Sequence, residues 1–139
     1  MNKMTNTLHT NKRLWQKHVL AENRRSIEGL LETLCAEPVY ELLATGERYL
    51  GREGVTRFYS GLFAGMPDAN FELVSVTIGE TGVVEESVLT GTHTGELFGM
   101  PASGKNVRLP LVIIFPIQDG LFTGERLYFD LGTLQRQLG

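Results

Sequence analysis

Apolar residues recur at helical spacing in the first half of the chain and at strand-like spacing in the second half. Between Lys12 and Cys35 they form one arc of a helix, made of Trp15, Val19, Ile27, Leu30, Leu31 and Leu34. Asn23 falls inside this arc, whereas His18 and Arg25 point the other way. Because a buried polar side chain needs a hydrogen-bond partner, we expect Asn23 either to bind a neighbouring loop backbone or to point into a ligand cavity.

A second amphipathic helix is predicted between Gly51 and Gly65. Its apolar residues follow the i, i+3, i+4, i+7 pattern and are Val55, Phe58, Tyr59, Leu62 and Phe63. Gly65 stands where a C-terminal cap is expected. Before this helix, Pro38 ends the first helical region, residues 39–42 suggest a short strand, and residues 44–51 read as a loop.

The second half of the chain predicts strands. Residues 71–78 and 83–94 are two β-prone runs, and residues 108–130 read as two long strands joined at Asp119-Gly120, a dipeptide suited to a tight hairpin turn. The last nine residues could form one or two helical turns. Two helical elements followed by four antiparallel strands favour an α+β fold with the helices packed on one face of a curved sheet.

Length and composition indicate one globular domain. Of 139 residues 42% are hydrophobic, and no repeat or low-complexity segment divides the chain. Residues 1–11 are polar without periodicity and are predicted to be a disordered tail, so the domain is expected to cover residues 12–139.

Charge and cysteine content exclude several function classes. A net charge of −3 argues against a nucleic-acid partner, which would need a clustered basic face. No apolar run is long enough for a membrane span, and no signal-peptide pattern opens the chain. Cys35 is the single cysteine, and no cysteine and histidine spacing suits zinc. A cytoplasmic protein without metal or cofactor is therefore expected.

Asp130 is the acid that turn chemistry does not explain. Asp68 and Asp119 lie in turns, whereas Asp130 follows the last strand. It could cap the terminal helix, a common role of aspartate. Alternation also places Arg126, Tyr128 and Asp130 on one strand face, which would form a polar wall in an apolar pocket.

His93 is the second candidate for chemistry. It lies in the segment TGTHTG at the end of a β-prone run. A lone histidine in a strand is more often structural than catalytic. Its case as a base depends on contact with Asp130, because an aspartate–histidine pair can hold one mobile proton near neutral pH.

The segments GTHTGELFGMPASGKNV, ERLYFD and QRQLG, together with the helical EGVTRFYSGLFAGMPD, resemble the SnoaL-like polyketide cyclase family. The resemblance covers nearly the whole chain after the tail. It implies the nuclear-transport-factor-2-like, or cystatin-like, fold: a strongly bent antiparallel sheet forming a cone around helices, with a deep apolar pocket.

The resemblance also implies a reaction. In the family, the acid matching Asp130 is a general acid/base assisted by the histidine matching His93, and the reaction is a cofactor-free intramolecular aldol cyclisation. A ketosteroid isomerase-like site would want a tyrosine where this chain has Trp15, and an epoxide hydrolase-like site would want a second aspartate beside Arg126. Substitution of Asp130 by Asn is then expected to abolish turnover while leaving the fold and ligand affinity largely intact.

The expected ligand is a small hydrophobic carbonyl compound. Besides Asp130 and His93, the residues expected to contact it are Asn23, Trp15, Tyr128, Arg126, Phe58, Phe98 and Met100. The alternative is a non-catalytic binding protein that uses the same pocket, which would gain support if Asp130 proved to be locked in a cap or ion pair. A third interpretation, a filled cone that serves only dimerisation, predicts no cavity.

A homodimer is expected with either of the first two functions. The strand VRLPLVIIF is apolar on both faces, and only one face can line the interior. A second copy would cover the outer face.

Overall fold

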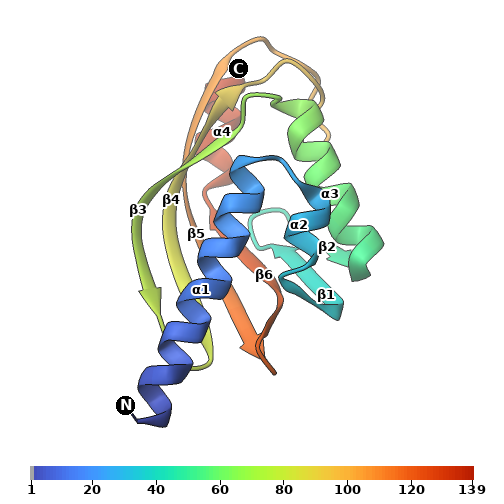
Figure 1. Ribbon diagram of the computed structural model, residues 1–139. Helices are drawn as coiled ribbons and strands as arrows, with labels where there is room; N and C mark the ends of the chain where they lie inside the picture. The colour runs from blue at the N-terminus through green and yellow to red at the C-terminus, as the bar shows by residue number, and fades with distance from the viewer. Residues whose placement is uncertain (1) are drawn as a thin grey trace.

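The computed structural model describes residues 2–139, and over these residues six strands form one curved sheet in the order β2-β1-β6-β5-β4-β3 (Figure 1). The strands are β1 (Leu34–Leu42), β2 (Glu47–Leu50), β3 (Asn70–Ile78), β4 (Gly82–Thr92), β5 (Asn106–Gln118) and β6 (Leu121–Phe129). Neighbours are antiparallel except β1 and β6, which run parallel. The predicted α+β class and bent sheet are confirmed, but the sheet is mixed rather than wholly antiparallel.

Helices cover the concave side of this sheet. They are α1 (Lys3–Asn23), α2 (Ile27–Leu31) and α3 (Gly51–Gly65), while the terminal helix α4 (Leu131–Leu138) packs against β5 (Figure 1). The core lies between the helices and the sheet and includes Leu30, Val55, Leu62, Ile113 and Phe122. Among residues 2–139, no helix is long and apolar enough to cross a membrane.

The start of α1 differs from the prediction. Residues 3–11, expected to belong to a disordered tail, are helical. Asn11 is buried, and its amide donates to the backbone carbonyls of Gly79 and Glu80 at 2.8 and 3.1 Å. The prediction took polar residues as a sign of disorder. The polar side chain of Asn11 instead binds the turn between β3 and β4.

The end of α1 also differs from the prediction. Arg25 adopts a positive φ of 52°, and Ser26 caps the N-terminus of α2 by accepting a hydrogen bond from the backbone N–H of Gly29. Leu34, expected on the same helix, begins β1. The predicted arc over residues 12–35 therefore crossed a break, and the helical face derived from it was wrong.

The remaining elements agree closely with the sequence pattern. α3 and the strands β3 to β6 lie where they were predicted, as does the terminal helix. At the hairpin turn Asp119 and Gly120 have φ values of 53° and 77°, as a tight turn requires. Residues 39–42 form the second half of β1, and β2 occupies part of the expected loop.

Alternation along β5 and β6 decides which side chains enter the core. On β5 the buried residues are Val107, Leu109, Leu111, Ile113 and Phe115, and on β6 Glu125 and Leu127 are buried while Arg126 and Tyr128 are not. Tyr128 is 42% exposed. The grouping of Arg126 with Tyr128 was predicted correctly, but their side of the sheet was not, because the apolar Leu127 takes the inner face.

Gly124 allows β1 and β6 to approach closely. Its φ is 143°, and a Cβ atom added there would lie 1.8 Å from the carbonyl oxygen of Val39. The register of the β1–β6 pair also shifts between Leu34 and Val39. Gly124 therefore fixes the backbone immediately before Glu125, and only glycine fits there.

Candidate active site

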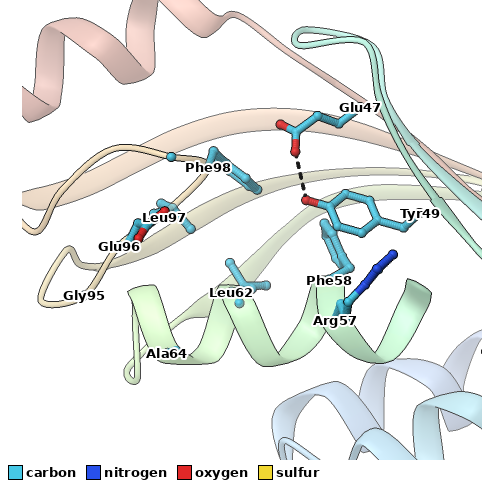
Figure 2. A pocket seen from close by; sticks show the side chains of 12 residues that line it. Glu47, Tyr49, Arg57, Phe58, Leu62, Ala64, Gly95, Glu96, Leu97 and Phe98 are labelled. Atoms are coloured by element: carbon cyan, nitrogen blue, oxygen red, sulfur yellow. Dashed lines mark hydrogen bonds between the residues drawn. The ribbon is translucent and has the colours of Figure 1, made fainter. Parts of the chain in front are cut away.

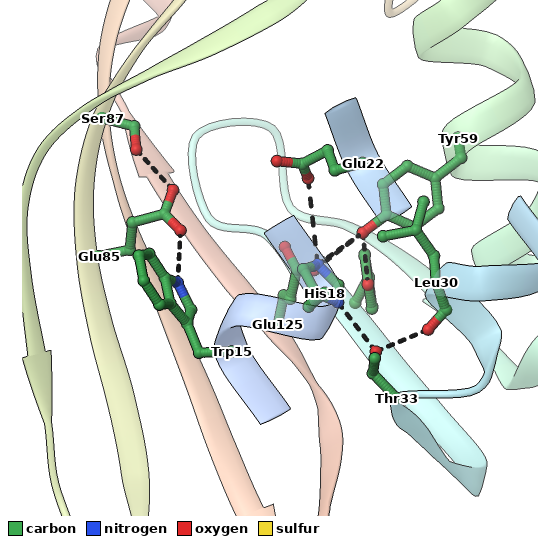
Figure 3. Close-up of polar contacts among 10 residues, drawn as sticks. Trp15, His18, Glu22, Leu30, Thr33, Tyr59, Glu85, Ser87 and Glu125 are labelled. Carbon is green, nitrogen blue, oxygen red and sulfur yellow. Dashed lines mark hydrogen bonds and ion pairs between the residues drawn. The ribbon is translucent and has the colours of Figure 1, made fainter. Parts of the chain in front are cut away.

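The space between the helices and the sheet contains a connected group of polar side chains, which we call the interior cluster (Figure 3). Its members come from five parts of the chain and are His18, Glu22, Thr33, Tyr40, Tyr59 and Glu125. Each is between 0 and 8% exposed. Such burial is costly for polar groups unless they bind one another, so their mutual contacts define the chemistry of the cluster.

α1 supplies one side of the interior cluster. Trp15, His18 and Glu22 follow the i, i+3, i+7 spacing, which places their side chains on one helix face. That face lies against the concave side of the sheet (Figures 1 and 3). The helix therefore presents an imidazole and a carboxyl group to Glu125 on β6.

His18 lies at the centre of the interior cluster. Its Nε2 atom is 3.1 Å from Oε2 of Glu125 and 4.0 Å from Oε2 of Glu22. Its Nδ1 atom is 2.9 Å from the hydroxyl of Thr33. The rings of Phe115 and Phe122 contact the imidazole edge-on, with centroids 5.2 and 5.6 Å away. Close packing and two polar contacts hold this ring in one orientation.

Two tyrosines extend the cluster from Glu125. The hydroxyl of Tyr59 donates to Oε2 of Glu125 at 2.9 Å and lies 2.6 Å from the hydroxyl of Tyr40. Burial, and after it the charge of Glu125, raises the pKa of both tyrosines well above the usual value. Both phenols therefore stay protonated and act as hydrogen-bond donors near neutral pH.

Glu22 is the member of the cluster with the weakest polar contacts. Burial first, and then the charges of Glu125 and Glu85, raise the pKa of its carboxyl group well above the usual value. Within residues 2–139, the buried polar residues around Glu22, Glu85 and Glu125 include one basic side chain, that of His18. Burial therefore favours the neutral form of the Glu22 carboxyl group, which can donate a hydrogen bond.

A second buried carboxylate lies on β4. Glu85 accepts a hydrogen bond from the indole N–H of Trp15 at 2.8 Å and another from the hydroxyl of Ser87 (Figure 3). Both of its oxygens are thus occupied by donors. Trp15, predicted to contact the ligand, is a buried residue whose N–H binds this carboxylate.

Asp130 does not lie in the interior. Its side chain is 70% exposed, and it caps α4 by accepting hydrogen bonds from the backbone N–H and the hydroxyl of Thr133 at 3.2 and 2.7 Å. The guanidinium of Arg136 is 3.7 Å away. The hydroxyl of Thr133 is the main cause that holds the pKa of Asp130 below the usual value. The expected position in an apolar pocket is wrong, because after Gly124 the inner face of β6 carries Glu125 and Leu127.

His93 is buried but makes structural contacts. Its Nδ1 atom is 2.9 Å from the hydroxyl of Ser103, and its Nε2 atom is 3.2 Å from the carbonyl oxygen of Met100. The backbone N–H of Ser103 also points at Nδ1, at 3.3 Å. Because Nδ1 accepts that hydrogen bond, Nε2 carries the proton and donates to Met100. The ring holds the loop between β4 and β5, and its partners do not include Asp130.

Two predicted ligand contacts do line a pocket. Phe58 on α3 and Phe98 in the loop after β4 border a cavity of about 440 Å³, together with Glu47, Tyr49, Arg57, Gly61, Leu62, Ala64, Gly95, Glu96, Leu97 and Gly99 (Figure 2). The ring of Phe58 also packs against the rings of Tyr40 and Tyr59, with centroids 5.3 and 5.1 Å away. The ring of Phe58 therefore contacts both this pocket and two tyrosines of the interior cluster.

The other predicted contacts lie elsewhere. Asn23 is exposed at the end of α1, so neither interpretation of it as a buried residue holds. Arg126 and Tyr128 lie on the outer face of the sheet. Met100 is partly buried and packs against the core, and its backbone pairs with Leu97.

Sequence reasoning missed the residues that the structure brings together. His18 was assigned to the polar side of α1, and neither Glu125 nor Glu22 was considered. One signal was available on β6, where Leu127 and Phe129 share the face of Glu125 and identify it as the inner face. The contact of His18 with Glu125 joins residues far apart in the chain and has no local signal.

The cluster has the composition of an acid–base site. Within residues 2–139, no group of three or more histidine, cysteine, aspartate or glutamate side chains is arranged to hold a metal ion. The arrangement offers an imidazole and a carboxyl group in contact, His18 and Glu125, and two possible hydrogen-bond donors, Glu22 and Tyr59, whose pKa values are raised by burial. Such groups can remove a proton from carbon and stabilise the resulting oxyanion.

Comparison with known proteins adds a family. The sequence profile of the SnoaL-like polyketide cyclases matches residues 11–138. No curated protein matches the chain at a significant level.

Several solved structures are similar over nearly the whole chain. A protein named as a SnoaL-like polyketide cyclase from Jannaschia sp. CCS1 is 25% identical, with a TM-score of 0.81, covering 99% of this chain and 94% of the other. One named as a polyketide cyclase from Xanthomonas campestris pv. campestris is 24% identical, with a TM-score of 0.84 and coverage of 96% and 99%.

A third similar structure is an NTF2-like protein of unknown function from Burkholderia pseudomallei K96243. It is 15% identical, with a TM-score of 0.79, and covers 93% of this chain and 97% of the other. At this identity the likeness concerns the fold, which is the nuclear-transport-factor-2-like fold predicted above.

Proposed function

The chain belongs to the SnoaL-like polyketide cyclase family, and from that premise we propose that it is a cofactor-independent acid–base enzyme. Its substrate is a small hydrophobic carbonyl compound, and its reaction begins with removal of a proton α to a carbonyl group. Aldol cyclisation or isomerisation then follows from the same enolate. The observation that carries the proposal is the pair formed by His18 and Glu125 at 3.1 Å in a buried site.

Glu125 is the base in this proposal. Its carboxylate takes the α-proton, and the electrons of the broken C–H bond move to the carbonyl to form an enolate. His18, protonated on Nε2, stays opposite Glu125 and balances the negative charge that develops on the substrate. In a cyclisation the enolate carbon attacks a second carbonyl, and the new alkoxide takes the proton back from Glu125. Water exclusion strengthens each of these interactions.

Glu22 and Tyr59 are the hydrogen-bond donors in this proposal. Burial raises the pKa of both groups and favours their protonated forms, and both border Nε2 of His18, at 4.0 and 3.4 Å. The carboxylic acid of Glu22 would donate to the enolate oxygen, while Tyr59 keeps its hydroxyl proton on Oε2 of Glu125. A neutral carboxylic acid is an effective donor of this kind when burial keeps it protonated.

The pocket beside Phe58 is the proposed entrance. Its volume of about 440 Å³ falls within the range of small-molecule sites. Phe58 and Phe98 give it apolar walls, while Glu47, Arg57 and Glu96 make its rim polar. Movement of the Phe58 ring away from Tyr40 and Tyr59 would connect this pocket with the interior cluster.

The family resemblance assigns the acid–base role to Asp130 and His93, and that assignment is the rival proposal. It requires an exposed helix cap to act as a base, and a histidine whose two ring nitrogens already bind a loop. Variants of Glu125 and Asp130 separate the two assignments directly.

The test measures exchange of α-protons for deuterium in D2O by NMR. The probes are α-tetralone and 1-phenylbutane-1,3-dione, two hydrophobic ketones with enolisable positions. We expect the protein to accelerate exchange, and Glu125→Gln to lose about 10²- to 10⁴-fold of that acceleration. Glu28→Gln, at an exposed glutamate on α2, is the matched control. Equal rates for Glu125→Gln and the unaltered protein would refute the proposal.

A non-catalytic binding protein is the second candidate. The cap formed by Asp130 is the observation that favours it, because a carboxylate engaged in a cap is a poor base. This candidate predicts that both probes bind while their α-protons exchange at the rate in buffer alone.

We also propose that two copies pair through the outer sheet face. Val84, Val88, Val112, Ile114 and Tyr128 gather there, and Val84 and Tyr128 are 43% and 42% exposed. Glu86 and Arg126 lie in adjacent rows of the same face, so a two-fold axis could pair each with the other. Light scattering at micromolar concentration should show a dimer, and Ile114→Lys should weaken it. A monomeric unaltered protein contradicts this proposal.

A further inference from the structure

We propose that Thr33 is a positioning residue that fixes the protonation of His18 on Nδ1, so that the site retains one movable proton, between His18 and Glu125. This inference rests on the proposed acid–base function for its catalytic meaning. The protonation pattern itself can be measured without any substrate.

The hydroxyl of Thr33 has its proton committed elsewhere. Thr33 is fully buried, and its Oγ1 atom lies 2.6 Å from the carbonyl oxygen of Leu30. A carbonyl oxygen can only accept, so the hydroxyl proton must lie between these two atoms. The same oxygen is 2.9 Å from Nδ1 of His18 and is left to act as an acceptor there. Nδ1 must therefore carry a proton.

The hydrogen bonds at the opposite end of the cluster also have a fixed direction from donor to acceptor. Tyr59 donates its hydroxyl proton to Oε2 of Glu125. Tyr40, 2.6 Å from Tyr59, must then donate to the oxygen of Tyr59. The phenols therefore point their protons toward Glu125, just as Nδ1 points its proton toward Thr33.

One proton, between Nε2 of His18 and Oε2 of Glu125, is not fixed by either of these ends. Nε2 of His18 and Oε2 of Glu125 are 3.1 Å apart, and two bare acceptors would repel at that distance. A proton must lie between them, on either the imidazole or the carboxylate. The other titratable groups that face the ring are Glu22 at 4.0 Å and Tyr59 at 3.4 Å, and both lie at Nε2 rather than at Nδ1.

Removal of the Thr33 hydroxyl should reverse this pattern. With valine at position 33, Nδ1 would face a methyl group and a proton there would have no acceptor. His18 would then adopt the neutral form with its proton on Nε2, donated to Glu125, and Nδ1 would be bare. The site would lose the cationic imidazole that balances an enolate, although Glu125 and its contacts with Tyr59 remain.

The experiment is ¹⁵N–¹H correlation spectroscopy of the three histidine rings near pH 7, where the two neutral tautomers and the imidazolium give distinct patterns. His18→Gln identifies the signals of His18. We expect Nδ1 of His18 to be protonated in the unaltered protein and in Thr33→Ser, and unprotonated in Thr33→Val. Circular dichroism checks that both variants are folded.

Two results would overturn the inference. A bare Nδ1 in the unaltered protein contradicts the first step, and this measurement does not depend on any variant that could fail to fold. A protonated Nδ1 in folded Thr33→Val shows that another group sets the tautomer.

The catalytic consequence is read in the α-proton exchange assay. Thr33→Val should lose at least about tenfold of the exchange rate and change its pH profile, while Thr33→Ser restores both. If the unaltered protein exchanges neither probe, the acid–base proposal fails while the protonation pattern still stands or falls on the NMR result. If the NMR pattern holds but Thr33→Val keeps its full rate and pH profile, Thr33 is structural only and the inference is overturned.

Discussion

Glu125 and Asp130 are five residues apart, yet they lie in opposite environments. Glu125 is 2% exposed on the concave face of the sheet and binds His18 and Tyr59. Asp130 is 70% exposed and binds the first turn of α4. An odd separation along an extended strand reverses the face of the sheet, so only one of the two acids can enter the interior.

The difference shows that burial, rather than position in a motif, decides the chemistry of a carboxyl group. The hydroxyl of Thr133, and after it the backbone N–H groups of Gly132 and Thr133, favour the charged form of Asp130 and hold its pKa low. In the interior, by contrast, burial holds the pKa of Glu22 high. The interior therefore favours the neutral form of the Glu22 carboxyl group.

Among the variants that test this comparison, Gly124→Ala should lower the stability of the protein the most. A Cβ atom would lie 1.8 Å from the carbonyl oxygen of Val39, so β6 would have to move away from β1 and carry Glu125 with it. We expect a loss of more than about 4 kcal/mol in the free energy of unfolding, measured by denaturant titration. Gly61→Ala, on open helix surface, is the control and should be neutral or slightly stabilising. A tolerated Gly124→Ala would mean that the backbone before Glu125 is not constrained as described.

Tyr59→Phe should have the next largest effect. It removes one donor to the buried Glu125 and leaves the hydroxyl of Tyr40 without its partner. We expect a destabilisation of about 1–3 kcal/mol. Tyr49→Phe removes a hydroxyl that binds the exposed Glu47 and should cost far less. Similar losses in the two variants would argue that the interior cluster adds no stability of its own.

Glu22→Gln should change how stability depends on pH. The folded protein keeps the carboxyl group of Glu22 protonated above its ordinary pKa of 4.5, where the unfolded chain releases the proton. Folding therefore binds a proton, and this group makes stability fall as pH rises from that value toward the raised pKa. The slope is at most about 1.4 kcal/mol per pH unit. Denaturant titrations across this range should show a shallower fall in Glu22→Gln, and an unchanged slope would contradict the raised pKa.

Asp130→Asn should have the smallest effect. The lowered pKa of Asp130 gives the opposite sign, because stability from this group is present above its ordinary value of 3.8 and is lost as pH falls through the lower folded value. Asparagine caps helices about as well as aspartate, so thermal denaturation near pH 7 should hardly change. A flatter acid limb of the pH–stability curve is the expected signature. A large loss of stability at pH 7 would show that Asp130 does more than cap α4.

The fold from Gly51 onward could be predicted because its signals are local. Alternating apolar residues, the Asp119-Gly120 turn and the helical spacing of Val55, Phe58 and Leu62 each act within a few residues. The break after α1 was missed because it uses Arg25 at positive φ instead of glycine or proline. The cap at Ser26 was the signal that could have revealed it.

The candidate site could be predicted only in part. Phe58 and Phe98 were expected near the ligand, and they line the pocket beside the interior cluster. The cluster itself depends on the parallel pairing of β1 with β6 and on the rotation of α1, neither of which the sequence pattern reveals. The predicted helix arc wrongly placed His18 on the outer side of α1, and the predicted strand face wrongly placed Asp130 in the interior.

The most direct test of the interior acid–base site compares Glu125→Gln with Asp130→Asn in the α-proton exchange assay, using α-tetralone and folded protein of each variant. We predict that Glu125→Gln loses about 10²- to 10⁴-fold of the catalysed rate, while Asp130→Asn stays within about twofold of the unaltered protein. Loss of activity in Asp130→Asn together with full activity in Glu125→Gln would contradict the interior site and identify Asp130, after β6, as the base.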